Sequence, residues 1–240
     1  MVLDATSGQP LETLTANGST EPATSYERIF AVTWAFAPIW SPDGDEITFV
    51  GQAGGADGSP ARDQALGLFA LPVTGGERTQ LLIDDGNIGR VSYAPGGTLV
   101  FDFTPMGENQ VPELRRYTPT TGAVEPIVGA PPASYDPIVT PDGRAIVFAT
   151  RTQDGTDLYT LPLAGGTPQR LTALRQARAP AIAPDGTQLA FLAAAAGASN
   201  FDLWIADLRA AADGSLAIGE PRQVTRGLRI DPGSRLAWGP

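Results

Sequence analysis

A four-residue phrase recurs along this 240-residue chain and constrains its architecture more than any other feature. The copies are Ser41-Pro42-Asp43-Gly44, Ala94-Pro95-Gly96-Gly97, Thr140-Pro141-Asp142-Gly143, Ala183-Pro184-Asp185-Gly186 and a degraded Asp231-Pro232-Gly233-Ser234. Their prolines lie 43 to 53 residues apart, and a short strand-like run follows each copy. Self-similarity at about 40–50 residues is typical of propeller blades. The sequence therefore predicts an all-β propeller of four-stranded antiparallel blades.

Each repeat can be divided into four strands. In the third repeat we expect them at 137–139, 144–149, 158–161 and 169–172, joined by the Pro-Asp-Gly turn and by a Gly-Gly hairpin. The same division places the blades at about 27–84, 88–129, 134–174 and 177–225.

The two ends of the chain are complementary. Residues 1–15 resemble the two outer strands of a blade, and residues 226–240, with a strand expected at Arg235–Trp238, resemble the two inner ones. We therefore predict a single domain over 1–240 with five blades, the fifth built from both termini, which removes the free sheet edge. The alternative is an open piece of a larger propeller with six or more blades.

Composition excludes several classes of partner. The chain carries 26 acidic residues against 16 bases, all of them Arg, and a net charge of −10. Such a chain repels phosphate backbones and anionic membrane surfaces, so we expect no nucleic acid and no membrane insertion. No apolar run approaches the length of a membrane span, and no signal peptide is expected within the chain. We expect a monomer.

The repeat resembles the TolB-like propeller family. The third and fourth copies carry the resemblance best, with Thr140–Phe148 followed by Asp157–Thr172, and Ala183–Phe191 followed by Asp202–Trp204. The resemblance implies a bacterial, periplasmic or extracellular protein that binds other proteins. The same repeat builds the propellers of prolyl-oligopeptidase-like hydrolases, so fold alone does not settle function.

The residues that repeat are expected to be structural. The aspartates of the turns, Asp43, Asp142 and Asp185, are typical turn formers, although spaced carboxylates could also serve acid–base or metal chemistry. Four phenylalanines at one repeat position, Phe49, Phe101, Phe148 and Phe191, are expected to pack between blades.

The absent residue types limit catalysis. The sequence has no His, no Cys and no Lys, which excludes a Ser-His-Asp triad, a thiol nucleophile and a Schiff base in this chain. We therefore expect no enzyme activity, no cofactor and no metal. Calcium binding by Asp84 and Asp85 stays an open alternative, since Ca²⁺ takes carboxylate oxygens.

Counting back from each turn glycine aligns the starts of the inner strands. One position holds Ala37, Arg90, Asp136, Ala179 and Arg226, and the preceding position holds Phe36, Gly89, Tyr135, Arg178 and Thr225. We predict a partner-binding face at this end of the propeller, formed by Arg90, Arg178, Arg226, Tyr135, Asp136, Phe36 and Trp34. Guanidinium groups match carboxylates, so an acidic or carboxylate group is expected on the partner. The alternative is that these arginines bridge neighbouring blades or are solvated.

Two long connections, 16–35 and 51–65, are expected on the same face. The first contains Tyr26, Phe30 and Trp34, which could form a binding hot spot or plug the channel. The sequence therefore predicts a non-catalytic scaffold that binds a protein or peptide. The alternatives are the accessory propeller of a hydrolase and a propeller that binds a small ligand or carbohydrate.

Overall fold

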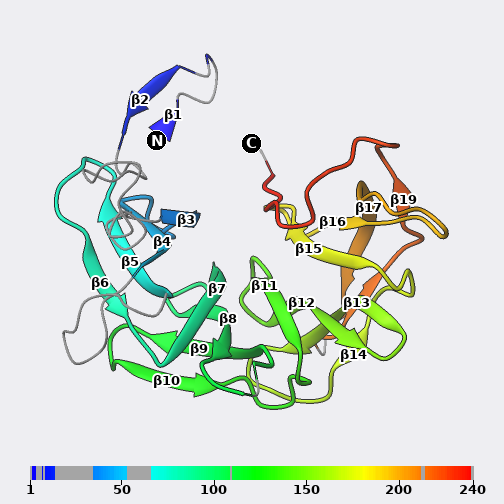
Figure 1. Ribbon diagram of the computed structural model, residues 1–240, viewed down its shortest axis with the longest axis horizontal. Helices are drawn as coiled ribbons and strands as arrows, with labels where there is room; N and C mark the ends of the chain where they lie inside the picture. Colours follow the sequence, from blue (N-terminus) through cyan, green and yellow to red (C-terminus); the bar gives the residue numbers. More distant parts are fainter. Residues whose placement is uncertain are drawn as a thin grey trace. The chain divides into compact units, whose positions relative to one another are not determined.

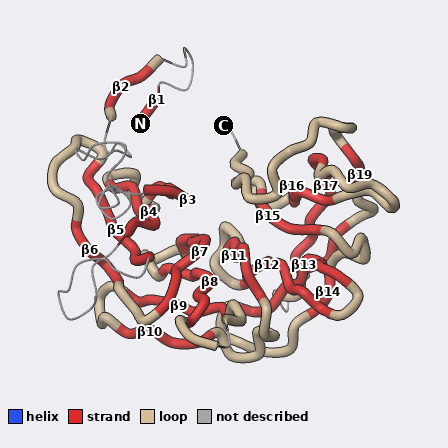
Figure 2. The backbone as a smooth tube through the Cα atoms, viewed as in Figure 1, coloured by secondary structure: helices blue, strands red, loops and turns tan. Residues whose placement is uncertain are grey.

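A computed structural model describes residues 2–3, 7, 9–13, 35–52, 66–108, 110–211 and 214–238. Figure 2 shows strands and connecting loops only, and the described part of the chain contains no helix and hence no helix that could cross a membrane. The strands of each repeat pair in antiparallel fashion (Figure 1). A single parallel bridge between Leu66 and Asn87 joins the first two repeats in one sheet, whereas the third and fourth repeats each form a sheet of their own. The prediction of an all-β fold of antiparallel blades is confirmed.

The chain divides into two compact units. Unit 1 comprises Met1–Gly89 and Thr104–Gln110, and unit 2 comprises Arg90–Phe103 and Val111–Pro240.

Unit 1 contains the first full repeat. Its strands are β1 (Val2–Leu3), β2 (Pro10–Glu12), β3 (Ala35–Trp40), β4 (Glu46–Gln52), β5 (Leu66–Pro72) and β6 (Thr79–Leu82). The first two strands pair with each other, and β3 to β6 pair in sequence order as an antiparallel sheet.

Unit 2 contains most of the second repeat and all of the third and fourth repeats (Figure 1). The second repeat forms β7 (Gly86–Tyr93, which begins in unit 1), β8 (Leu99–Pro105), β9 (Glu113–Thr118) and β10 (Ala123–Pro126). The third repeat forms β11 (Ser134–Val139), β12 (Ala145–Thr152), β13 (Gly155–Pro162) and β14 (Gln169–Arg170). The fourth repeat forms β15 (Ala177–Ile182), β16 (Gln188–Ala193), β17 (Asp202–Ala210), β18 (Leu216–Ile218) and β19 (Arg222–Gln223).

The recurring turn connects the first two strands of each sheet as expected. In the third repeat the amide of Gly143 donates to the carbonyl of Thr140 at 2.8 Å. The Asp142 carboxylate accepts from the Thr140 hydroxyl at 2.6 Å and from the Arg144 amide at 3.0 Å. Asp43 and Asp185 accept equivalent local hydrogen bonds, so these aspartates are turn formers.

The phenylalanines of the second strands fill the space between sheets. Phe148 packs in one core cluster with Val100 and Leu114 of the preceding sheet. Phe191 packs in the next cluster with Val147 of the third sheet. Such interdigitation of neighbouring faces buries large apolar area, so the prediction of inter-blade packing is confirmed at these two positions.

A buried aspartate at the start of the third strand holds the outermost strand of the blade. Asp157 accepts hydrogen bonds from the Thr172 hydroxyl at 2.7 Å, the Leu174 amide at 2.8 Å and the Arg175 amide at 3.1 Å. Arg170 adds an ion pair to it at 2.5 Å. We call this arrangement the aspartate clamp. The aspartate clamp was not predicted from the sequence, although Asp and Thr recur at these positions.

The fourth sheet repeats the clamp. Asp202 accepts from the Thr225 hydroxyl at 3.0 Å and from the amides of Gly227 and Leu228 at 3.0 and 3.2 Å. The insertion after β17 forms an extra hairpin with β18, which pairs with the end of β17.

One strand prediction is wrong. Residues 235–238 form no strand in the described part of the chain, and the segment is held by side chains instead. The indole Nε1 of Trp238 donates to the carbonyl of Ala181 at 3.1 Å. A strand requires a ladder of backbone hydrogen bonds to a neighbour, and this segment has no such ladder within unit 2. Closure of a fifth blade stays a prediction.

Candidate functional site

The inner strands carry an irregularity at the position that the repeat alignment singled out. The pairing register shifts between Tyr135 and Ile138 in β11 and between Arg178 and Ala181 in β15. Asp136 and Ala179 lie inside these bulges in the left-handed region, with φ of 55° and 51°. Bulges re-aim backbone and side-chain groups, often beside functional sites. The residue types did not predict these two bulges, since neither Asp136 nor Ala179 is a glycine.

Two buried carboxylates accept the amides that the bulges turn inward. Asp102 on β8 accepts from the amides of Arg90 at 3.0 Å and Asp136 at 3.1 Å. Asp136 in turn accepts from the amide of Ala179 at 3.1 Å. Each carboxylate therefore links one sheet to the next through backbone donors, and both are buried.

Asp136 is also the centre of an ion network. Its Oδ1 lies 2.8 Å from Nε of Arg90, and its Oδ2 lies 3.2 Å from Nε of Arg178. The Arg178 guanidinium lies over the ring of Tyr135 at 5.2 Å from its centroid. Asp136 is 4% exposed, whereas Arg90 and Arg178 are 16% and 27% exposed. The network is therefore anchored inside the protein and reaches the solvent through its arginines.

Arg90 ties the network to the C-terminal segment. Its Nη2 donates to the carbonyl of Gly233 and to that of Ser234, the latter at 3.0 Å. The next residue, Arg235, lies in the same segment, and repulsion from Arg90 contributes to a lowered pKa of its guanidinium. Nη1 of Arg235 is buried and has no hydrogen-bond partner among the described residues.

Around Arg90, the environment shifts the pKa of Asp102 and that of Arg235. Burial, with the neighbouring charge of Asp136 as a second cause, raises the pKa of Asp102 to about 7. Burial, followed by repulsion from Arg90, lowers the pKa of Arg235 to about 10. The raised pKa of Asp102 reflects the cost of a second buried negative charge beside Asp136. The lowered pKa of Arg235 reflects a guanidinium that is partly buried and lies close to another positive charge.

The structure brings together four of the predicted site residues. Arg90, Tyr135, Asp136 and Arg178 form one network, and in it the arginines bridge neighbouring sheets, as the alternative interpretation held. Arg226 is exposed and forms no ion pair within the described ranges. The network instead contains Asp102, which was not among the residues predicted from the sequence.

The other predicted residues are not part of this network. Phe36 lies in unit 1 and is 38% exposed. Trp34 and most of the two long connections lie outside the described residues. No group of three acidic side chains suited to a metal ion occurs in the part of the chain that the structure describes.

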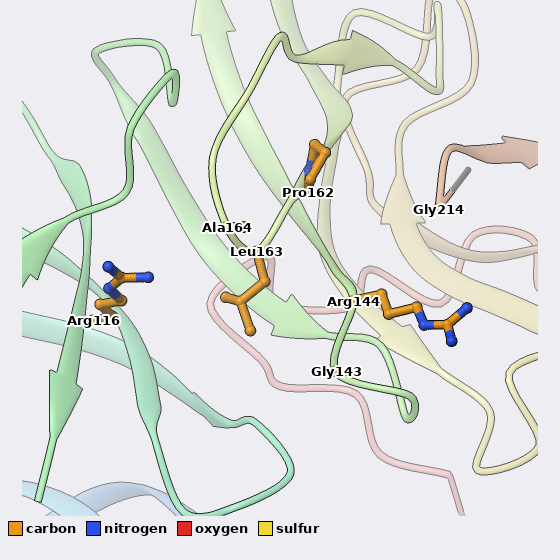
Figure 3. Close-up of a pocket in the computed structure, with 7 residues that line it drawn as sticks. All are labelled: Arg116, Gly143, Arg144, Pro162, Leu163, Ala164 and Gly214. Carbon is orange, nitrogen blue, oxygen red and sulfur yellow. The ribbon is translucent and has the colours of Figure 1, made fainter. Parts of the chain in front are cut away.

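A hollow lies at the turn ends of the strands in unit 2 and has a volume of about 650 Å³. It is lined by Arg116, Gly143, Arg144, Pro162, Leu163, Ala164 and Gly214. Figure 3 shows Leu163 between the side chains of Arg116 and Arg144. Arg116 is paired with Glu125 at 2.7 Å, and Arg144 is 71% exposed. The hollow therefore offers two arginine side chains that are accessible to solvent, whereas the carboxylates of the Asp136 network are buried.

Comparison with solved structures identifies the fold. TolB from Acinetobacter baumannii is 21% identical with a TM-score of 0.60, and the match covers 78% of this chain and 43% of that one. A putative TolB from Agrobacterium tumefaciens is 17% identical with a TM-score of 0.61, covering 80% and 65%. A puromycin-hydrolyzing peptidase of Mycobacterium tuberculosis is 18% identical with a TM-score of 0.59, covering 91% and 36%.

At these identities the likeness establishes a TolB-like β-propeller fold. This chain spans between about one third and two thirds of the length of the three structures. No family model matches the sequence, and no curated protein does.

Proposed function

We propose that the chain is a non-catalytic β-propeller scaffold that binds a protein or peptide in unit 2, at the starts of the inner strands β11 and β15. The pair of Arg178 and Tyr135 supports this proposal most directly. Asp136 fixes the arginine from inside, and the ring of Tyr135 supports its guanidinium, while 27% of the Arg178 side chain stays exposed. Arg and Tyr are enriched among residues that dominate binding energy, especially when they are held rigidly.

The partner would present an acidic or carboxylate group to these arginines. A periplasmic or extracellular location and a monomeric state accompany this proposal. The TolB-like fold supports the proposed binding role, because loops on a rigid propeller scaffold can hold binding groups in fixed positions.

Affinity selection tests the proposal. The immobilised chain would be offered a synthetic library of random peptides with free C-termini, and recovered peptides would be measured by calorimetry. We expect Arg178→Ala to weaken binding by about thirtyfold, as for a hot-spot residue. The matched control is Arg144→Ala, an exposed arginine at the turn ends. Equal binding by wild type and Arg178→Ala would contradict the proposed face.

A second candidate is the accessory propeller of a hydrolase. It is favoured by the match to the puromycin-hydrolyzing peptidase, which covers 91% of this chain but only 36% of that one. An adjoining α/β-hydrolase sequence with a Gly-x-Ser-x-Gly motif in the same gene would support this candidate. Peptide selection by the isolated propeller with an affinity that depends on Arg178 would favour the scaffold.

A further inference from the structure

Residues 230–238 lie against the sheets of unit 2 without belonging to any of them. Figure 1 shows this segment in red beside β15, and none of the described strands includes its residues. Its single backbone bridge joins Ile230 to Phe201, with the amide of Ile230 donating to the carbonyl of Phe201 at 3.1 Å. The segment is therefore docked on folded sheets and is not a strand of one.

Two side chains make the other contacts that hold the segment. Nη2 of Arg90 donates to the carbonyls of Gly233 and Ser234. The indole Nε1 of Trp238 donates to the carbonyl of Ala181 on β15 at 3.1 Å. Main-chain carbonyls are present in every peptide, so an extended peptide that carries a tryptophan can offer the same groups.

These contacts lie beside the binding face proposed above. Arg90 and Arg178 share the carboxylate of Asp136, at 2.8 and 3.2 Å. Ala181 follows Arg178 by three residues on β15, which is roughly 10 Å along a strand. The segment therefore occupies part of the surface that a partner would use.

The segment is docked more loosely than the strands. None of the residues 230–238 is buried, whereas β15 and β16 consist mostly of buried residues. Nη1 of Arg235 is buried and has no hydrogen-bond partner within the described ranges. A charged donor that loses its hydration without gaining an acceptor opposes docking. Release of the segment would therefore remove few contacts and would return this donor to water.

The residues before the segment allow it to leave without disturbing the fourth sheet. The aspartate clamp at Asp202 holds the amides of Gly227 and Leu228. Arg229 then adopts a φ of 52°, a strained conformation for a residue other than glycine. The clamp therefore ends at residue 228, and the chain turns away from the sheet at the next residue.

A partner can gain one contact that the segment does not make. The Arg178 guanidinium contacts Asp136 and Tyr135, and no hydrogen bond or ion pair joins it to the described residues of the segment. A carboxylate on a partner would engage this arginine with a charge-assisted hydrogen bond. A partner with that group therefore has an advantage over the segment at the same face.

We infer that residues 230–238 are an internal ligand of the proposed binding face and that a partner binds by displacing them. The partner is then an extended protein segment that offers main-chain carbonyls to Arg90 and a tryptophan to the carbonyl of Ala181. This inference rests on the proposed function, because it names the occupant of the same face.

A synthetic peptide with the sequence of residues 229–238 tests the inference. The peptide would carry a fluorescent label and a C-terminal amide, and its binding to the whole chain would be measured by fluorescence anisotropy. In the wild type the tethered segment competes at an effective concentration in the millimolar range, so we expect weak binding. Trp238→Ala in the chain loosens the tethered segment, and the peptide should then bind about tenfold more tightly or better.

Two controls show that the peptide uses the site of the segment. A peptide with alanine at the tryptophan position should not gain affinity for the Trp238→Ala chain, because it lacks the indole donor. Val128→Ala changes a 70% exposed apolar residue of unit 2 outside the segment, and this chain should bind the original peptide as weakly as the wild type does.

Hydrogen exchange of the wild-type protein needs no substitution, so it decides even if a variant misfolds. The hydrogen-bonded amides of Ile230, Gly233 and Ser234 should exchange by local opening, about tenfold or more faster than the core amides of β15 and β16. A peptide recovered by affinity selection should accelerate their exchange further, because it displaces the segment. A peptide that binds elsewhere would leave their exchange unchanged.

The possible outcomes separate this inference from the proposed function. Equal binding of the peptide by wild type and Trp238→Ala, with exchange of residues 230–238 no faster than that of the core, overturns the internal ligand. Selected peptides whose binding depends on Arg178 but does not accelerate this exchange also overturn it, and the scaffold then stands. Tighter peptide binding by Trp238→Ala without any selected peptide supports the internal ligand and contradicts the role of Arg178.

Discussion

Among single residues, Asp102 makes a pH-dependent contribution to stability. Burial and the nearby charge of Asp136 raise its pKa in the folded protein to about 7, whereas an unfolded chain holds it near ~3.9. Between these two pKa values, the Asp102 carboxyl group binds its proton more tightly in the folded state than in the unfolded state. The stability that Asp102 contributes is therefore fully present below about pH 4 and is lost as the pH rises through about 7.

Asp102→Asn should remove this dependence. Asn keeps a side-chain oxygen for the amides of Arg90 and Asp136 but does not ionise. We expect the free energy of unfolding of wild type minus that of the variant to fall by a few kcal/mol between about pH 4 and pH 7 and then to level off. Urea unfolding across this range measures it. A difference that does not vary with pH would refute the assignment.

The difference measurement isolates Asp102 from the other acids. Hydrogen bonds with Ser41, with Thr140 and with residue 187 lower the pKa of Asp43, Asp142 and Asp185 respectively. These groups stabilise the fold above their usual titration range and lose that effect as the pH falls, which is the opposite sign. Because they are present in both proteins, they cancel.

Part of the network can be predicted from the sequence, and part cannot, for a physical reason. Counting from the turn placed Arg90, Asp136 and Arg178 at neighbouring positions because the inner strands share a fixed length before the turn. Asp102 belongs to the network through a hydrogen bond from the amide of Asp136 in the next sheet. No spacing in the sequence indicates which carboxylate meets which donor across a sheet boundary.

Among whole elements, the aspartate clamp decides whether the outer strand stays attached. The outer strand β14 has only two residues, so its ladder to β13 is short. Asp157 compensates by accepting from the Thr172 hydroxyl and two backbone amides beyond β14. The same geometry at Asp202 holds β19, which also has two residues.

Asp157→Ala should therefore destabilise the protein strongly. The substitution leaves several buried donors without an acceptor, and we expect a loss of about 3 kcal/mol or more in the free energy of unfolding. Urea unfolding measures the loss. The matched control is Asp154→Ala, an exposed position three residues earlier, which should change stability by less than about 0.5 kcal/mol. Equal midpoints for both variants would contradict the clamp.

The elements that sequence analysis placed well are those set by local chemistry. Pro-Asp-Gly turns specify their own conformation, so a strand follows the turn in each of the first four repeats as predicted; the structure places these strands at 46–52, 99–105, 145–152 and 188–193. The bulges and the short outer strands depend on hydrogen bonds to distant residues. Ala179 adopts a left-handed conformation because the Asp136 carboxylate accepts its amide, which its residue type does not indicate.

At the scale of the whole molecule, ring closure is the open structural question. The termini supply complementary strands in the sequence, but the final segment of unit 2 is held by Trp238 and Arg90 instead of by a strand ladder. An open sheet edge invites association with other chains, so closure by residues 1–15 would be favourable. We predict that the N-terminal strands close a fifth blade.

Spin labelling tests closure cleanly because the chain contains no cysteine. Labels at Leu11→Cys and Leu228→Cys, both 64% exposed, would report the separation of the two ends. Closure predicts a short and narrow distance distribution, since strands of one blade lie ~4.8 Å apart. A pair at Val128→Cys and Leu228→Cys lies within unit 2 and should be narrow whether or not the ring closes. A broad distribution for the first pair with a narrow one for the second would show that the two ends of this chain do not form one blade.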